Sequence, residues 1–393
     1  MIILGIYDDH NASAALMING EIVEAINEER ITFIKNDVGF PKNAVKYLFK
    51  KYNINNDNLD FVGVSSSRPS AEQYNRLSAY IGIKDYKYFY KNYYNKKFNN
   101  INIFQKFIDK KNYSFDKSLY YHVNKKYNNK LNYSNIAHQN TVRQVFNDFY
   151  KISKNKIQFI DHHTCHLSHA YLSKVKKTKG PTIGVTVDAF GDGRNQTVWK
   201  IKNNNYRLLA DSNQCEIARI YRMVTLYLGM LPLQHEYKVM GLSPYAKKNY
   251  SNEIKDFFNT IIKLDGIKFV HRSRPKNMYT HIQENLQNYR FDNISRGLQD
   301  FVEENLVNLF KNIYQNTGIK NFVYSGGVAM NVKANKILHQ NNFINDLFVP
   351  AAPDDQGTSI GACYEIARLN NIKTTPIKNY YLGYDINDKN SNY

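Results

Sequence analysis

Two short apolar runs that each lead into a glycine-containing turn constrain the fold of this chain most strongly. Residues 182–187 (TIGVTV) continue into Asp188 and the turn at 191–193 (GDG), and residues 321–324 (NFVY) continue into 325–327 (SGG). A strand, a double glycine and a helix start bring backbone N–H groups and the helix dipole to one point, which suits a phosphate. After Asp188, an ordinary tight turn is an equal interpretation. The pattern predicts an α/β fold with nucleotide-type loops.

Further strands and helices are expected on both sides of these segments. Residues 2–7 predict a strand, and residues 15–26 predict a hairpin because Asn19-Gly20 separates two apolar runs. A helix is predicted from about residue 40 to 52, where a proline opens a set of spaced apolar residues. Another is predicted from about 294 to 316, where apolar residues repeat at the helical period.

Histidines are concentrated in one segment. Four of the chain's 11 histidines lie within residues 161–170 (DHHTCHLSHA). If this segment is helical, His162 and His166 share one face and can offer two nitrogen ligands to one metal. A histidine-rich turn with solvated rings is the alternative. Asp355, in an acid–glycine turn after a strand, is the natural third ligand, and such a set leaves positions open for substrate oxygens.

Positive charge is also unevenly placed. Residues 76–156 hold 17 Lys or Arg against 4 Asp or Glu, within a formal net charge of +19. This block favours anions, although a solubilising surface explains it as simply. Its tyrosines alternate with lysines, a pattern that can stack bases, but we favour a small helical insertion. Nucleic acid is therefore not the expected partner.

The composition favours a cytoplasmic protein. Residues 1–10 lack the basic start of a signal peptide, and no apolar stretch approaches the length of a membrane span. Three cysteines do not make a disulfide framework. Residues 228–245, punctuated by glycine and proline, predict a loop that presents Glu236 and Lys238 before a helix.

Seven motifs in order resemble the NodU/CmcH-type O-carbamoyltransferases. They are residues 10–15 (HNASAA), 28–30 (EER), 161–166 (DHHTCH), 187–193 (VDAFGDG), 236–242 (EYKVMGL), 325–331 (SGGVAMN) and 355–357 (DQG). The resemblance covers nearly the whole chain except the basic block. It implies an α/β fold made of a duplicated actin/sugar-kinase-like (ribonuclease H-like) domain. This domain is related to TsaD, the transferase that completes threonylcarbamoyl-adenosine on tRNA.

The resemblance also implies roles for individual residues. His162, His166 and Asp355 would hold a divalent ion, with iron expected. His10 stands in the position of the family's catalytic histidine, and Lys35 matches a basic residue that holds phosphate. The residues expected to bind the nucleotide, as carbamoyl-adenylate or ATP/ADP, are Asp188, Gly191, Gly193, Ser325, Gly326, Gly327, Val328, Asn331 and Asn335; His163, Glu236 and Lys238 are expected to support the substrate.

This family normally continues into a YrdC-like domain, which makes carbamoyl-adenylate from carbamoyl phosphate and ATP. We expect residues 1–70 and 157–378 to form the two-lobed transfer domain, 71–156 a basic insertion, and 379–393 the start of a linker to that missing domain. The chain would then be a fragment, a natural short form, or one half of a split system whose second domain is a separate protein. Phe33 and Asn36 replace the Arg and His that the family tends to have near Lys35.

The predicted function is therefore the transfer half-reaction of a biosynthetic O-carbamoyltransferase. It would move a carbamoyl group from carbamoyl-adenylate to a hydroxyl of a sugar, a natural product or a glycan. One alternative is a tRNA-directed relative, against which the motifs at 10–15 and 236–242 argue. The other is a degenerate nucleotide-binding scaffold, against which the retained His162, His166 and Asp355 argue.

Overall fold

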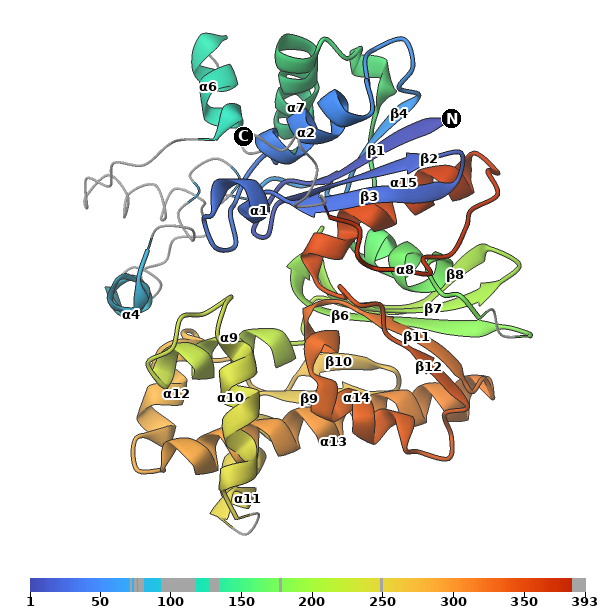
Figure 1. Ribbon diagram of the computed structural model, residues 1–393. Helices are drawn as coiled ribbons and strands as arrows, with labels where there is room; N and C mark the ends of the chain where they lie inside the picture. The colour runs from blue at the N-terminus through green and yellow to red at the C-terminus, as the bar shows by residue number, and fades with distance from the viewer. Residues whose placement is uncertain are drawn as a thin grey trace. The chain divides into compact units, whose positions relative to one another are not determined.

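The computed structural model describes residues 1–70, 73, 76, 81–92, 118–127, 134–176, 179–247 and 250–383. It divides into two compact units (Figure 1). The first unit draws on Met1–Tyr80, Phe104–Lys177 and Pro350–Tyr393, and the second on Ile81–Ile103 and Thr178–Val349. Much of the predicted basic insertion lies outside the described residues.

The first unit is built on a five-stranded mixed sheet with the order β3-β2-β1-β4-β5. β1, β2 and β3 form an antiparallel meander, and β4 and β5 run parallel to β1. The turn between β2 and β3 is Asn19-Gly20, both with positive φ, which confirms the predicted hairpin. The strands are β1 (Ile2–Tyr7), β2 (Ser13–Ile18), β3 (Glu21–Asn27), β4 (Phe61–Val64) and β5 (Ile157–Phe159).

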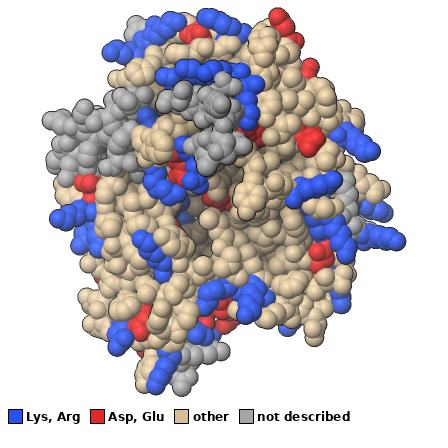
Figure 2. Space-filling view, viewed as in Figure 1, with Lys and Arg blue, Asp and Glu red and all other residues tan. Residues whose placement is uncertain are grey.

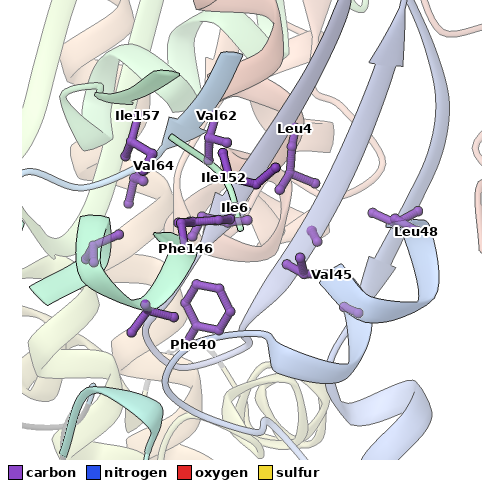
Figure 3. Close-up of a cluster of buried hydrophobic side chains, with 14 of the residues drawn as sticks. Leu4, Ile6, Phe40, Val45, Leu48, Val62, Val64, Phe146, Ile152 and Ile157 are labelled. Atoms are coloured by element: carbon purple, nitrogen blue, oxygen red, sulfur yellow. The ribbon is translucent and has the colours of Figure 1, made fainter. Parts of the chain in front are cut away.

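Helices cover both faces of this sheet (Figure 1). Because side chains alternate along a strand, Leu4 and Ile6 join the core under α2 and α7 (Figure 3), whereas Ile3 joins the core with α8 and α15. The helices are α1 (Glu29–Thr32), α2 (Lys42–Lys51), α6 (Leu119–Lys126), α7 (Asn135–Tyr150), α8 (His162–Leu172) and α15 (Thr358–Leu369), with 3₁₀ turns η2 (Lys154–Lys156) and η6 (Asp355–Gly357).

Two helices from the block predicted as an insertion contribute to the core of the first unit. Tyr120 of α6 and Phe146 of α7 are fully buried, and the ring centroid of Phe146 lies 5.3 Å from that of Phe40. By contrast α4 (Ile83–Asn92) groups with the second unit, where the Tyr90 carbonyl accepts a 2.7 Å hydrogen bond from Asn277. The domain boundaries drawn from the sequence stay a prediction.

The second unit repeats the sheet of the first. Its five strands have the order β12-β11-β6-β7-β8, with β6, β7 and β8 antiparallel and β11 and β12 parallel to β6. A separate two-stranded sheet pairs β9 with β10. The strands are β6 (Thr182–Gly191), β7 (Arg194–Lys202), β8 (Asn205–Ser212), β9 (Ile262–Asp265), β10 (Lys268–His271), β11 (Asn321–Ser325) and β12 (Asp346–Phe348).

The longest helix of the second unit is α13, which confirms the prediction at 294–316 and ends at Gly318 in the left-handed conformation. The helices are α9 (Ile217–Tyr227), α10 (Glu236–Leu242), α11 (Asn252–Asn259), α12 (Met278–Leu286), α13 (Phe291–Thr317) and α14 (Val332–His339), with 3₁₀ turns η3 (Ser243–Tyr245) and η5 (Gly327–Met330). Two sheets with the same strand order confirm the duplicated α/β fold. Over the part of the chain that the structure describes, no helix has both the length and the apolar character needed to cross a bilayer.

Candidate active site

His162 and His166 lie in the first turns of α8, which starts just after β5. Asp161 caps this helix by accepting a 2.9 Å hydrogen bond from the Thr164 N–H. Both imidazoles are buried, and their Nε2 atoms are 3.1 Å apart. The predicted helix is therefore confirmed, and the alternative of a turn with solvated rings is wrong.

Asp355 completes a triangle with these imidazoles. Its Oδ1 lies 3.3 Å from Nε2 of His162 and 3.3 Å from Nε2 of His166. This oxygen is buried and receives no hydrogen bond of good geometry from any described residue. Ligand atoms held about 2.1 Å from one metal ion lie about 3.0 to 3.4 Å apart. The three donor atoms therefore have the spacing of one face of a coordination sphere.

Two groups behind the triangle orient it. Nδ1 of His162 lies 3.3 Å from the Ser65 carbonyl oxygen, which can only accept, so Nε2 keeps its lone pair toward the triangle. The Tyr7 hydroxyl donates a 2.7 Å hydrogen bond to Asp355 Oδ2. Tyr7 and Ser65 lie at the carboxyl ends of the adjacent parallel strands β1 and β4, so the sheet brings them to one edge. Sequence reasoning missed both, because their shared position depends on the pairing of β1 with β4, which the local sequence around each residue does not show.

His10 approaches the same carboxylate from the loop after β1. Its Nε2 lies 3.4 Å from Asp355 Oδ2, and its side chain is 25% exposed. Burial acts to raise the pKa of Asp355, but electrostatic interaction with the imidazoles of His162 and His10 holds it well below its usual range. In the adjacent carboxyl group, burial and the charge of Asp355 raise the pKa of Asp354 to about 6. Asp355 is therefore the anionic member of the pair.

A close helix crossing fixes the distance between Asp355 and the two histidines. A Cβ atom at Gly361 of α15 would lie 2.0 Å from the carbonyl oxygen of Cys165 in α8. Only glycine permits this approach, since any side chain would separate the helices. Cys165 itself is buried, in keeping with a packing role.

The remaining residues predicted in the first unit differ in their surroundings. His163 is buried, and its ring centroid lies 5.7 Å from that of His162. Lys35 is largely exposed, and its Nζ lies 3.2 Å from Glu29 Oε1. The structure thus gathers His10, His162, His163, His166 and Asp355, whereas Lys35 pairs with Glu29.

In the second unit a hydrogen bond joins the two predicted nucleotide motifs. The Gly327 N–H donates to Asp188 Oδ1 at 2.9 Å, and the Phe190 N–H donates to Asp188 Oδ2 at 3.2 Å. Gly326 has a φ of 99°, and a Cβ atom there would lie 2.3 Å from the Val187 carbonyl oxygen. The predicted order of strand, double glycine and helix is confirmed by β11, η5 and α14.

Amide side chains hold the start of α14. Asn331 Oδ1 accepts a 3.0 Å hydrogen bond from the Ala334 N–H, and its side chain exchanges two 2.9 Å hydrogen bonds with Gln299, a partner that sequence reasoning missed. Asn335 donates to the Ala329 carbonyl at 2.7 Å, and its Oδ1 is buried without a partner among the described residues. The neighbouring Ser325 and Val328 are buried as well. Asn331 and Asn335 thus hold the glycine loop and the start of α14 in place.

Asp192 and Gly193 form the two-residue turn between β6 and β7. Both have positive φ, and Gly191 pairs with Arg194 across the hairpin. This is the geometry of the primed hairpin turns, which the ordinary-turn interpretation describes. A nucleotide role for Gly191 and Gly193 stays a prediction.

Glu236 and Lys238 lie in helix α10, so the prediction of a loop that presents them was wrong. Glu236 Oε1 accepts a 2.7 Å hydrogen bond from the Leu233 N–H, and an acidic residue at this end complements the helix dipole. Val239 is buried, which anchors the short helix. Lys238 is exposed, with its Nζ 5.8 Å from the Tyr237 ring centroid.

Lys and Arg lie in separate groups on the face shown in Figure 2, with Asp and Glu among them. Some lysines of the predicted basic block are paired, such as Lys126, whose Nζ is 2.9 Å from Asp148 Oδ2. On this face the described residues do not make the continuous basic stripe that follows a nucleic-acid backbone.

Comparisons with known proteins agree with the motifs. The family model "Carbamoyltransferase N-terminus" matches residues 2–364. An uncharacterized protein of Methanocaldococcus jannaschii is 27% identical over 397 residues, covering 98% of this chain and 61% of that protein. Nodulation protein NolNO of Sinorhizobium fredii is 23% identical over 359 residues, covering 90% and 45%. The chain therefore spans about half the length of these relatives.

Among solved structures, the chain is similar to component A of the (R)-2-hydroxyglutaryl-CoA dehydratase of Acidaminococcus fermentans. The two are 12% identical with a TM-score of 0.45, and the match covers 95% of this chain and 100% of that chain.

Proposed function

Because this chain belongs to the carbamoyltransferase family, we propose that it transfers a carbamoyl group from carbamoyl-adenylate to a hydroxyl group of an acceptor. The acceptor class is a small molecule or a glycan carrying a sugar-like hydroxyl. The observation that carries the proposal is the triangle of His162, His166 and Asp355, with His10 on the far oxygen of the same carboxylate.

The reaction needs a base but no covalent enzyme nucleophile. The acceptor oxygen attacks the carbamoyl carbon, the bond from that carbon to the AMP phosphate oxygen breaks, and AMP leaves with the bonding electrons. Nε2 of His10 takes the hydroxyl proton, since an imidazole accepts protons near neutral pH. Asp355 Oδ2, 3.4 Å away, stabilises the resulting imidazolium charge.

His162, His166 and Asp355 have the donor set and spacing for a divalent ion, and we propose Fe²⁺. Two imidazoles and one carboxylate on adjacent positions are typical of non-haem iron sites with open positions. A divalent ion bound there would supply Lewis acidity for a departing phosphate. The Tyr7 hydroxyl and the Ser65 carbonyl hold the carboxylate and the imidazole in the orientation that this requires.

The donor is proposed to bind through the glycine loop of the second unit. The loop supplies backbone N–H groups at a helix start, and Asn335, which donates to the Ala329 carbonyl, keeps the loop in place. His163 and Lys238 are proposed to support substrate binding, and Glu236 holds the turn before α10.

A YrdC-like domain or separate protein is proposed to make the carbamoyl-adenylate. The described residues carry one donor loop and one histidine cluster, which the transfer step uses. The synthesis of the donor from carbamoyl phosphate and ATP would then take place elsewhere.

The test supplies the purified chain with pre-formed carbamoyl-adenylate and a panel of hydroxyl acceptors, and follows AMP release and product mass. We expect carbamoylated product from this donor and none from carbamoyl phosphate plus ATP. His10→Gln should lower the rate by about 100-fold or more, as loss of a general base does. His339→Ala, which removes an exposed imidazole, is the matched control. Absence of any carbamoylated product from the pre-formed donor would overturn the proposal.

A further inference from the structure

Three basic side chains of the second unit converge on one buried carboxylate. Glu216, the residue before α9, is 2% exposed. Its Oε1 lies 3.3 Å from Arg219 Nη1, 3.0 Å from His271 Nε2 and 3.7 Å from Arg274 Nε. The three bases come from α9, from the end of β10 and from the segment after it.

This cluster carries more positive charge than Glu216 can neutralise. Two guanidinium groups face one carboxylate, and no acidic residue occurs between 272 and 283. Arg272 and Lys276, exposed in the same segment, add to the excess. An excess of fixed positive charge around one buried acid favours the binding of an anion on the solvent-exposed side of the cluster.

Arg274 has hydrogen-bond donors to spare. Its side chain is 57% exposed, and its long contact with Glu216 is the sole ion pair or hydrogen bond that its side chain makes with the described residues. An ion pair of this length and exposure is weak, so it costs little to turn the guanidinium toward a ligand. Its remaining N–H groups match the fork geometry of a phosphate.

An aromatic ring adjoins the cluster. The guanidinium carbon of Arg219 lies 5.1 Å from the ring centroid of Phe190, which is 50% exposed. The backbone N–H of Phe190 donates to Asp188, the carboxylate tied to the glycine loop. The cluster therefore offers an anion site and an apolar ring surface beside the predicted donor-binding turn.

We propose that Arg219, His271 and Arg274 bind the phosphate group of a phosphorylated sugar, and that this sugar is the carbamoyl acceptor. Glu216 holds the three bases in place, and Phe190 contacts the apolar face of the sugar ring. The inference rests on the proposed function and narrows its acceptor class from any hydroxyl compound to a phosphorylated sugar.

Binding is measured by calorimetry on the full chain without any donor. The probes are glucose 1-phosphate, glucose, inorganic phosphate and AMP. We expect glucose 1-phosphate to bind more tightly than glucose or inorganic phosphate. Arg274→Gln should weaken it by about tenfold, as loss of one charge-assisted contact does, and should leave AMP binding unchanged. Arg207→Gln, the same substitution at an exposed position on β8, is the matched control.

Three outcomes would overturn the inference. They are failure of the wild-type chain to bind glucose 1-phosphate, equal affinity in Arg274→Gln, and loss of AMP binding in that variant, which would assign the cluster to the donor. Arg219→Lys, which keeps the charge but not the fork, gives a second variant if Arg274→Gln fails to fold. A chain that carbamoylates other hydroxyl compounds but not the sugar phosphate would contradict the inference and leave the proposed function standing. A chain that makes no carbamoylated product from any acceptor would contradict the proposed function.

Discussion

The two sheets of this protein have the same strand order but carry different chemistry at equivalent strand ends. In the first unit Tyr7 ends β1 and Ser65 directly follows β4, and these residues orient Asp355 and His162. In the second unit, Asp188 lies in the equivalent strand β6 and Gly326 follows β11, and backbone N–H groups there bind the Asp188 carboxylate. One edge, here called the cation edge, is thus built from imidazole nitrogens and a carboxylate. The other, here called the amide edge, is built from backbone N–H groups.

The difference shows how a duplicated scaffold can carry different chemical groups at equivalent positions. Parallel strands bring residues that are distant in the sequence to one edge, and the residues placed there decide which ligand charge the edge suits. Buried ring nitrogens and a carboxylate suit a cation, whereas amides at a helix start suit an anion. The comparison predicts that a substitution at one edge weakens the ligand binding of that edge and leaves the ligand binding of the other edge intact.

The largest expected effect comes from a substitution in α7, the helix that packs on the first sheet. Phe146→Ala should lower the free energy of unfolding by about 3 to 5 kcal/mol, because it empties a fully buried site in α7. Phe149→Ala removes a ring that is 50% exposed on the same helix, and should change stability by about 0.5 kcal/mol or less. Chemical denaturation measures both. Equal effects would mean that α7 is a dispensable part of an insertion.

The next test removes one ligand of the proposed metal site in the first unit. His162→Ala should weaken divalent-ion affinity by more than about 100-fold, since even loss of a supporting group costs about 10- to 100-fold. Elemental analysis and anaerobic Fe²⁺ titration measure this, and His339→Ala serves as the control. AMP binding should survive in His162→Ala. If His162→Ala retained its full metal content, the proposed metal site at the first sheet would be contradicted.

The reciprocal test damages the amide edge. Gly326→Ala puts a Cβ against the Val187 carbonyl at a φ of 99°, so stability should fall by about 1 to 3 kcal/mol and AMP binding should weaken with it. Gly241→Ala is the control, because that helical glycine has open space within 4 Å and alanine should stabilise it by about 0.5 to 1 kcal/mol. Thermal unfolding and AMP titration report the outcome, and unchanged AMP affinity in Gly326→Ala would contradict the proposed donor loop.

Sequence reasoning reached the features of each edge that are local. The spacing of His162 and His166 gives their shared helix face, and the double glycine gives the strand-to-helix turn. It did not reach contacts that depend on strand neighbours, such as Tyr7 with Asp355, because a tyrosine at a strand end has no distinguishing pattern. It also misjudged α10, where an acid in the first turn and one buried valine outweigh the surrounding glycine and proline.

Tyr7→Phe tests whether the hydroxyl that supports Asp355 contributes to metal binding, and its expected effect is smaller. Loss of the hydroxyl that holds Asp355 Oδ2 should weaken divalent-ion affinity by about tenfold, the lower range for a supporting group. Tyr364→Phe removes a partly buried hydrogen bond, 2.8 Å to the Thr375 carbonyl, and should alter stability but not metal affinity. If both variants weaken metal binding equally, Tyr7 acts only through the stability of the unit.

The smallest expected effect concerns Lys35, whose role as a phosphate ligand is proposed from its position in the family motif. Because its Nζ is exposed and paired with Glu29, a solvent-screened contact contributes at most about 1 kcal/mol, so Lys35→Gln should weaken carbamoyl-adenylate affinity by about fivefold or less. Arg30→Gln removes an equal charge that lies 3.8 Å from the same Glu29 and should have no effect on that affinity. Steady-state kinetics with varied donor compare the two variants. Equal losses would mean that Lys35 contributes only general positive charge, and would restrict phosphate recognition to the amide edge.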